Sequence, residues 1–163
     1  MTGLFHSMEL WIVFAFLPIL GATALYDLRQ MRIPNFLSLA GLLLFALCLP
    51  LLGVEEWGWR ALTGFFTFML CFGLFVAGWL GGGDAKILPV TVLFVPFGHI
   101  ELYMLSFSAS MVLGMVGIWV VRQRMSHPDA RWVSMQPGAA FPMGISIAAS
   151  LPVALIAAQF FTL

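Results

Sequence analysis

Charge is scarce in this sequence, which has seven basic and seven acidic residues among its 163. Charged residues make up 9% of the chain, whereas the surface of a soluble domain normally carries about 25–35% Lys, Arg, Asp and Glu. Hydrophobic residues make up 62%, and the mean hydropathy is +1.04. This composition excludes an ordinary soluble domain and predicts a protein whose main solvent and partner is the lipid bilayer.

Net charge and metal-binding side chains are also lacking. The formal net charge is zero, so no basic excess indicates a nucleic-acid partner. Cys48 and Cys71 lie inside apolar runs, where a small buried hydrophobe is the default and neither a disulfide nor a metal site is indicated. No cofactor is expected, because no cluster has metal-ligand spacing and the histidines are scattered at His6, His99 and His127.

Long apolar runs dominate the rest of the chain. Arg29 is the first basic residue, so the N-terminal run lacks the charged region of a signal peptide and is interpreted as a retained span. A helix needs about 20 mostly apolar residues to cross the hydrocarbon core. Six segments are candidates, the fourth being short and proline-containing: residues 10–26, 33–54, 61–83, 87–100, 102–121 and 139–163. The prediction is an all-α, polytopic membrane protein with six transmembrane helices in a single domain, 1–163.

The positions of the basic residues support this topology, because Lys and Arg collect in cytoplasmic loops. The opposite face holds only Arg60 and four glutamates. The connections after spans one, three and five hold the other six basic residues: Arg29, Arg32, Lys86, Arg122, Arg124 and Arg131. We therefore expect a multi-pass protein of the cell inner (plasma) membrane, with both termini outside the cytoplasm.

Two carboxylates stand at the cytoplasmic ends of predicted spans, since Asp27 closes the first span and Asp84 follows the third. An ionisable residue within a membrane segment indicates a functional site, whereas one at the headgroup level can simply be solvated. For Asp27 a capping or interfacial role is the alternative. Asp84 follows Gly81-Gly82-Gly83, and glycine permits φ > 0 or the close approach of a peptide substrate. A plain helix C-cap is the alternative there.

Three short motifs lie along this order of spans. Residues 27–35 read DLRQMRIPN, in which an aspartate precedes basic residues and then Pro34-Asn35. Residues 81–86 read GGGDAK, with Lys86 two positions after the aspartate, and residues 141–144 read FPMG, with Pro142 and Gly144. Together these motifs resemble those of the type IV prepilin peptidases, which are GxGD-type aspartic peptidases of the membrane. The resemblance extends over essentially the whole chain.

The resemblance implies a membrane-embedded aspartic endopeptidase with Asp27 and Asp84 as its catalytic pair. It implies that prepilin or pseudopilin substrates lose a short basic leader at the cytoplasmic membrane face, during pilus assembly. It also implies site-shaping or substrate-binding roles for Gly81, Gly82, Gly83, Lys86, Pro34, Asn35, Pro142 and Gly144. For Lys86, an ordinary anchor at the cytoplasmic face is the alternative.

The chain differs from the larger bacterial members, which carry an amino-terminal cytoplasmic domain with paired Cys-x-x-Cys motifs. It is similar instead to the short form, found in the peptidases of tight-adherence (Flp-type) pili and in archaeal preflagellin peptidases. The amino-methyltransferase activity of the larger enzymes is therefore not part of the expectation.

Hydrolysis by two aspartates explains why a pair is required. One ionised carboxylate takes a proton from a bound water, while the other, protonated, donates to the scissile carbonyl oxygen. Two carboxylates close together cannot both ionise cheaply, so they share a proton and act as a unit. The acid and base roles are therefore assigned to the pair and not to either residue.

Two other functions fit the same residues. In a non-catalytic scaffold of a pilus or secretion assembly, Asp27 and Asp84 would be helix caps, and the function would not depend on carboxylate chemistry. A small proton-coupled transporter would also use membrane aspartates and helices broken by Gly and Pro, although the two halves show no inverted repeat. Asp129, in the last cytoplasmic loop, is expected to be dispensable for catalysis.

Overall fold

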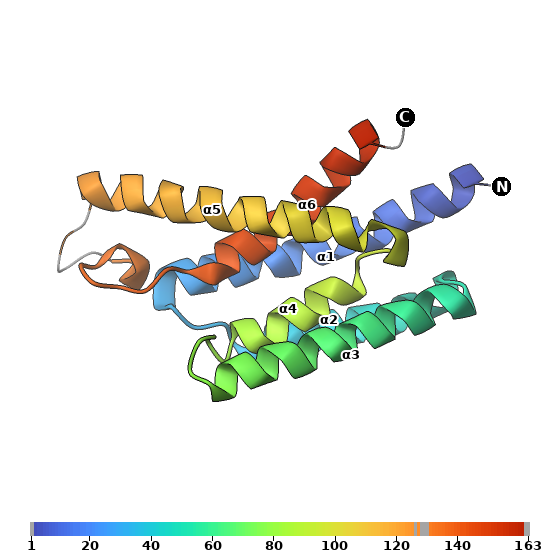
Figure 1. Ribbon diagram of the computed structural model, residues 1–163, viewed down its shortest axis with the longest axis horizontal. Coiled ribbons are helices and arrows are strands. Elements are labelled where there is room, and N and C mark those ends of the chain that lie inside the picture. The colour runs from blue at the N-terminus through green and yellow to red at the C-terminus, as the bar shows by residue number, and fades with distance from the viewer. Residues whose placement is uncertain (1, 126, 128–130, 162–163) are drawn as a thin grey trace. The chain divides into compact units, whose positions relative to one another are not determined.

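The computed structural model describes residues 2–125, 127 and 131–161 (Figure 1). Within these residues every regular element is a helix, and there is no strand. The elements are α1 (Thr2–Gln30), α2 (Asn35–Cys48), η1 (Leu49–Leu51), α3 (Val54–Val76), α4 (Asp84–Leu93), η2 (Phe97–His99), α5 (Ile100–Met125), η3 (Val133–Met135) and α6 (Met143–Phe161). The prediction of an all-α fold is confirmed.

The apolar runs lie in these helices. In the described part of the chain, three stretches are long and apolar enough to cross a bilayer: Trp11–Gln30, Val54–Val76 and Phe97–Arg124. Two shorter helical stretches, Asn35–Leu51 and Met143–Ala158, are also apolar. Many large hydrophobic side chains on these helices are exposed, as on α3 and α5, and such a surface on helices long enough to span a bilayer is typical of contact with lipid. The chain is therefore a membrane protein.

Among the helix ends that differ from the predicted spans, two have a clear local cause. The third span was expected to reach Gly83, but α3 ends at Val76, where Gly78 adopts φ +77° and closes a Schellman motif. The fourth was expected over 87–100, but α4 ends at Leu93, because Pro96 disfavours helical backbone at the residue before it. These predicted bounds were wrong. The ten residues of α4 rise only about 15 Å, half the thickness of the hydrocarbon core.

The helices group into two compact units, of which the first comprises the start of α1 to Ile19 and residues Asn35–Ile100. Helices α2, α3 and α4 lie side by side in it (Figure 1). Phe94, at the end of α4, stacks on Phe16 with 3.9 Å between ring centroids and meets Phe45 edge-on. This aromatic cluster lies in the core of the first unit.

A buried arginine lies in the first unit. Arg60 is 0% exposed, and its Nε donates to Glu56 Oε1 at 2.9 Å, one turn earlier in α3. The same Glu56 oxygen accepts the backbone N–H of Phe97 at 3.2 Å, which links α3 to η2. The sequence placed Arg60 in a connection at the outer face. It lies inside a helix instead, where a partner of opposite charge compensates its burial.

The second unit contains Leu20–Pro34 and Glu101–Leu163, with α5 and α6 as its main helices. Ser146 Oγ donates to the carbonyl oxygen of Ser110 at 3.0 Å, which places α6 directly against α5. Small residues recur every four positions on both helices, at 106, 110 and 114 on α5 and at 146, 150 and 154 on α6. Such spacing lets membrane helices approach closely without a large side chain between them. The single domain over 1–163 stays a prediction.

Candidate active site

Asp27 lies one turn before the end of α1, in the second unit, and is 6% exposed. The helix ends there because Met31 adopts a left-handed conformation, φ 53°, and its N–H donates to the Asp27 carbonyl oxygen at 2.9 Å. A non-glycine residue with positive φ is uncommon and marks a constrained turn. The backbone of Asp27 is thus fixed by the helix end itself.

The Asp27 side chain meets the start of another helix. The N–H of Gly144 donates to Asp27 Oδ2 at 2.7 Å, across 117 positions of sequence. Gly144 is the second residue of α6, so its N–H has no acceptor within that helix. The amino end of a helix also carries partial positive charge, which favours a carboxylate beside it. This hydrogen bond therefore gives the Gly144 N–H an acceptor and the buried Asp27 carboxylate a donor.

Glycine at position 144 is required by the closeness of this contact. A Cβ there would stand 2.8 Å from Asp27 Cβ and 2.9 Å from Oδ2, distances that real Cβ atoms essentially never show. Pro142, immediately before α6, is buried and has a fixed φ, which suits the start of a helix. Of the predicted element Pro142-x-Gly144, glycine is the member that contacts Asp27.

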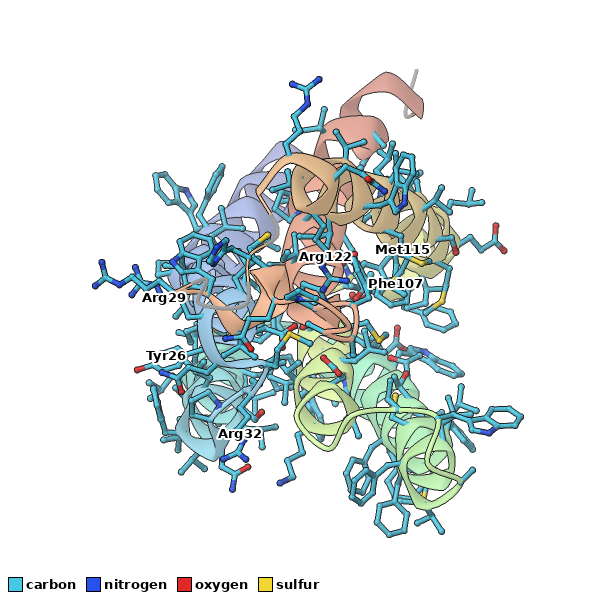
Figure 2. All side chains as sticks on the ribbon, turned by 90° about the vertical axis from the view of Figure 1, so that its left-hand side faces the viewer. Tyr26, Arg29, Arg32, Phe107, Met115 and Arg122 are labelled. Atoms are coloured by element: carbon cyan, nitrogen blue, oxygen red, sulfur yellow. The ribbon has the colours of Figure 1, made fainter. Side chains whose placement is uncertain are left out.

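Two basic residues of the second unit contact the segment that precedes α6. Arg122 Nε donates to the Ser134 carbonyl oxygen at 2.8 Å, and Nη2 donates to the Ala140 carbonyl oxygen at 2.7 Å. Figure 2 shows Arg122 directed at this segment. The Arg29 guanidinium lies over the Trp132 ring, 5.9 Å from its centroid. The sequence had indicated a topological role for both arginines and had also placed Arg29 in the basic stretch of the first motif.

Asp84 is the first residue of α4, in the first unit, with Gly83 as the N-cap residue. A carboxylate in the first turn of a helix is favourably placed. A Cβ at position 81 would stand 2.7 Å from Asp84 Oδ2, so the carboxylate lies over Gly81 in space that any other residue would fill. At Gly82, a Cβ would meet the Phe75 ring at 3.1 Å.

The three glycines before Asp84 do not adopt positive φ. Among the described residues, the glycines with positive φ are Gly78 and Gly138. Of the two uses of glycine considered for residues 81–83, φ > 0 is therefore not seen, and Gly81 and Gly82 instead make close contacts within the chain. These contacts are with the Asp84 carboxylate at Gly81 and with the Phe75 ring at Gly82.

Lys86 and Asn35 join two of the motifs within the first unit. Lys86 Nζ donates to Asn35 Oδ1 at 2.9 Å. Asn35, which follows Pro34, is the first residue of α2, and Lys86 lies in the first turn of α4. The sequence had suggested a site-shaping or substrate-binding role for Lys86, with an anchor at the cytoplasmic membrane face as the alternative. Its hydrogen-bond partner in the structure is Asn35.

A groove begins at this pair and runs between α2, α3 and α4. Its volume is about 500 Å³, and it lies wholly within the first unit. Asn35, Ser38 and Lys86 supply its polar groups, and the rest of its lining is apolar, with Leu42 and Phe65 among the walls. The groove is therefore polar near the start of α4 and apolar along its length.

No metal site is evident in the part of the chain that the structure describes, where no three His, Cys, Asp or Glu side chains come together. Cys48 and Cys71 are buried free thiols. The absence of a cofactor stays a prediction, as does the pairing of Asp27 with Asp84, which belong to different units. Asp129 lies outside the described residues.

Some features of the site were missed from the sequence. The regular spacing of small residues at 106, 110, 114 and at 146, 150, 154 could have indicated that α5 packs on α6. The contacts of Arg122 gave no comparable signal, because a side chain that binds backbone carbonyls leaves no pattern in the residues it contacts.

The fold and these surroundings define an α-helical membrane protein in which two aspartates are held at helix ends, each against a glycine. Residues 12–162 match the model of the type IV leader peptidase family. The match covers most of the chain, so the chain belongs to this family, and the resemblance seen in its motifs is confirmed. Family membership implies peptidase activity. No curated protein and no solved structure matches the chain.

Proposed function

We propose that this protein is an aspartic endopeptidase that removes the short basic leader of prepilin or pseudopilin substrates at the cytoplasmic face of the inner membrane. The observation that carries the proposal is the closeness of a glycine to each aspartate of the family motifs. Gly144 binds Asp27 through its N–H, and Gly81 leaves room for the Asp84 carboxylate. Such fixed positions suit groups that must meet a reacting peptide bond in one geometry.

The proposed reaction needs both carboxylates at one peptide bond. The ionised carboxylate removes a proton from a water molecule, and the oxygen of that water attacks the scissile carbonyl carbon. The protonated carboxyl donates its proton to the carbonyl oxygen. The C–N bond then breaks, and the leaving nitrogen takes up a proton. Because two adjacent carboxylates share one proton, each can serve as acid or base within the cycle.

Chain connectivity supports the pairing. Residues 31–34 join α1 to α2, and the five Cα steps from Gln30 to Asn35 can cover at most roughly 18 Å. Asn35 in turn binds Lys86, two residues after Asp84. The short connection between the first motif and Asn35, together with this hydrogen bond to Lys86, favours a joint site for the two motifs.

The groove supports the proposed substrate class. A prepilin has an apolar segment directly after the bond to be cut, and the groove is apolar beyond the Asn35–Lys86 pair. We propose that the apolar segment of the substrate occupies this groove, with the bond to be cut near the Asn35–Lys86 pair.

The proposed topology has six membrane spans and both termini outside the cytoplasm. It is supported by the basic residues at the ends of α1 and α5.

Replacing each aspartate by asparagine tests catalysis against scaffolding. Asparagine keeps an oxygen that can accept the Gly144 N–H, so a capping role would survive in Asp27→Asn, but an amide cannot take or share a proton. We expect Asp27→Asn and Asp84→Asn each to lower kcat for a prepilin substrate by about 10²–10⁴-fold, with membrane insertion unchanged.

The assay is cleavage of a purified prepilin by each enzyme variant in lipid nanodiscs, followed by gel mobility and mass spectrometry. Asp129→Asn is the matched control and should cleave normally. Normal processing by either purified active-site variant would remove that aspartate from the catalytic pair and would favour the scaffold alternative.

A further inference from the structure

A segment without a long helix leads from α5 into α6 over residues 131–142. These described residues contain one short 3-10 helix, η3, and a turn at Gly138, where φ is +77°. We call residues 132–142 the connecting segment. It leads directly into the first turn of α6, which carries the N–H that binds Asp27. The course of the connecting segment therefore decides where that N–H lies.

Arg122 fixes this course by binding the connecting segment at two points. Its Nε and Nη2 donate to the carbonyl oxygens of Ser134 and Ala140, at 2.8 and 2.7 Å. A guanidinium is planar and presents several N–H groups in a rigid fork, so one side chain can hold two carbonyls in a set relation. Both acceptors are backbone atoms, so the constraint acts on the path of the chain.

The second of these points is close to the site. Ala140 lies four residues before Gly144, and the residues between them are themselves constrained. The Phe141 ring packs on α5 at Gly114, where a Cβ would stand 3.1 Å from Phe141 Cζ, and Pro142 has a fixed φ. A shift at Ala140 would therefore be passed on to the start of α6.

We propose that Arg122 is a positioning residue for Asp27: it holds the connecting segment so that the Gly144 N–H meets the Asp27 carboxylate. The catalytic part of this inference rests on the proposed function, whereas the structural part does not. If Arg122 only supplied a positive charge at the cytoplasmic face, it would be equivalent to Arg124, which is exposed at the same end of α5. The two arginines are therefore a matched pair for the test.

The test uses the full chain in nanodiscs, with the variants Arg122→Met, Arg122→Lys and Arg124→Met. One readout is amide hydrogen exchange in the first turn of α6. Loss of the fork should raise exchange there by at least ~10-fold in Arg122→Met, with no change in α4 and none in Arg124→Met. Arg122→Lys should be intermediate, since an ammonium cannot reproduce the fork.

The second readout is kinetic. A small displacement of a catalytic group lowers kcat more than it alters binding, so we expect Arg122→Met to lose roughly 10- to 100-fold in kcat with KM within about twofold. Arg122→Lys should recover part of this loss, and Arg124→Met should match the wild type. If both Arg122→Met and Arg124→Met behave as the wild type in exchange and in kinetics, the proposal is overturned.

Two further outcomes are also decisive. If Arg122→Met does not fold, Arg122→Lys alone decides: raised exchange at α6 with lowered kcat supports the proposal, and wild-type values overturn it. If Asp27→Asn cleaves normally, the proposed function fails. Exchange in Arg122→Met then still shows whether Arg122 holds Gly144 in place.

Discussion

Substituting Gly144 by alanine is the most direct perturbation of the Asp27 site. The new Cβ would stand 2.8 Å from Asp27 Cβ, 2.9 Å from Oδ2 and 3.2 Å from Cγ. Asp27 has little room to move, because its side chain is buried and its carbonyl oxygen accepts the Met31 N–H. The start of α6 must therefore shift away, which lengthens or breaks the Gly144–Asp27 hydrogen bond.

The size of the effect follows from two opposing contributions. Overpacking a buried site costs about 1–3 kcal/mol. Alanine in place of glycine stabilises a helix by up to about 1 kcal/mol, and by less in its first turn. The net loss of stability should therefore lie between about 0 and 3 kcal/mol. If the whole steric cost appears in the transition state, kcat falls by about 5- to 150-fold.

Gly117→Ala is the matched control, since Gly117 is a helical glycine of α5 in the same unit with nothing within 4 Å of a new Cβ. It should leave kcat unchanged and raise stability by about 0.5–1 kcal/mol. The assays are prepilin cleavage in nanodiscs and thermal unfolding in detergent. If Gly144→Ala keeps wild-type kcat and gains stability as Gly117→Ala does, the close contact with Asp27 does not matter for activity.

Two further predictions concern the first unit and the topology. Gly81→Ala should displace the Asp84 carboxylate, whose Oδ2 would lie 2.7 Å from the new Cβ, and should therefore lower kcat. Gly73→Ala is the control and should leave kcat unchanged, because nothing lies within 4 Å of its new Cβ. Equal activity of the two variants would contradict this prediction. Cysteines introduced at either terminus should react with an impermeant thiol reagent from outside the cell, with little background because Cys48 and Cys71 are buried. A C-terminus labelled only from the cytoplasm would refute the six-span topology.

The helical architecture could be predicted because a membrane helix has a strong sequence signal, a long run of apolar residues. The helix ends were less accurate where local backbone chemistry overrides hydropathy. Gly78 ends α3 through its positive φ, although apolar residues continue after it. Helix α4 stops before Pro96, so its length depends on one proline and not on the hydropathy of the segment.

The candidate site was only partly accessible from the sequence. Short motifs singled out Asp27 and Asp84, since the residues that form them are contiguous. The contact of Asp27 with Gly144 joins positions 117 apart, and no local pattern encodes such a separation. The two carbonyls bound by Arg122 belong to the backbone, so the identity of their residues carries no information about the contact.

The buried Arg60 has a consequence for how the chain enters the membrane. An arginine in a membrane helix costs up to about 2.5–3.5 kcal/mol on insertion, the value for the helix centre. Arg60 is the seventh residue of α3, which is synthesised before Phe97 exists to bind Glu56. Glu56, however, is one turn away in the same helix, so the ion pair can form while α3 is still alone. Arg60 can therefore insert together with Glu56 as its counterion. When η2 forms later, the Phe97 N–H adds a second hydrogen bond to the same Glu56 oxygen.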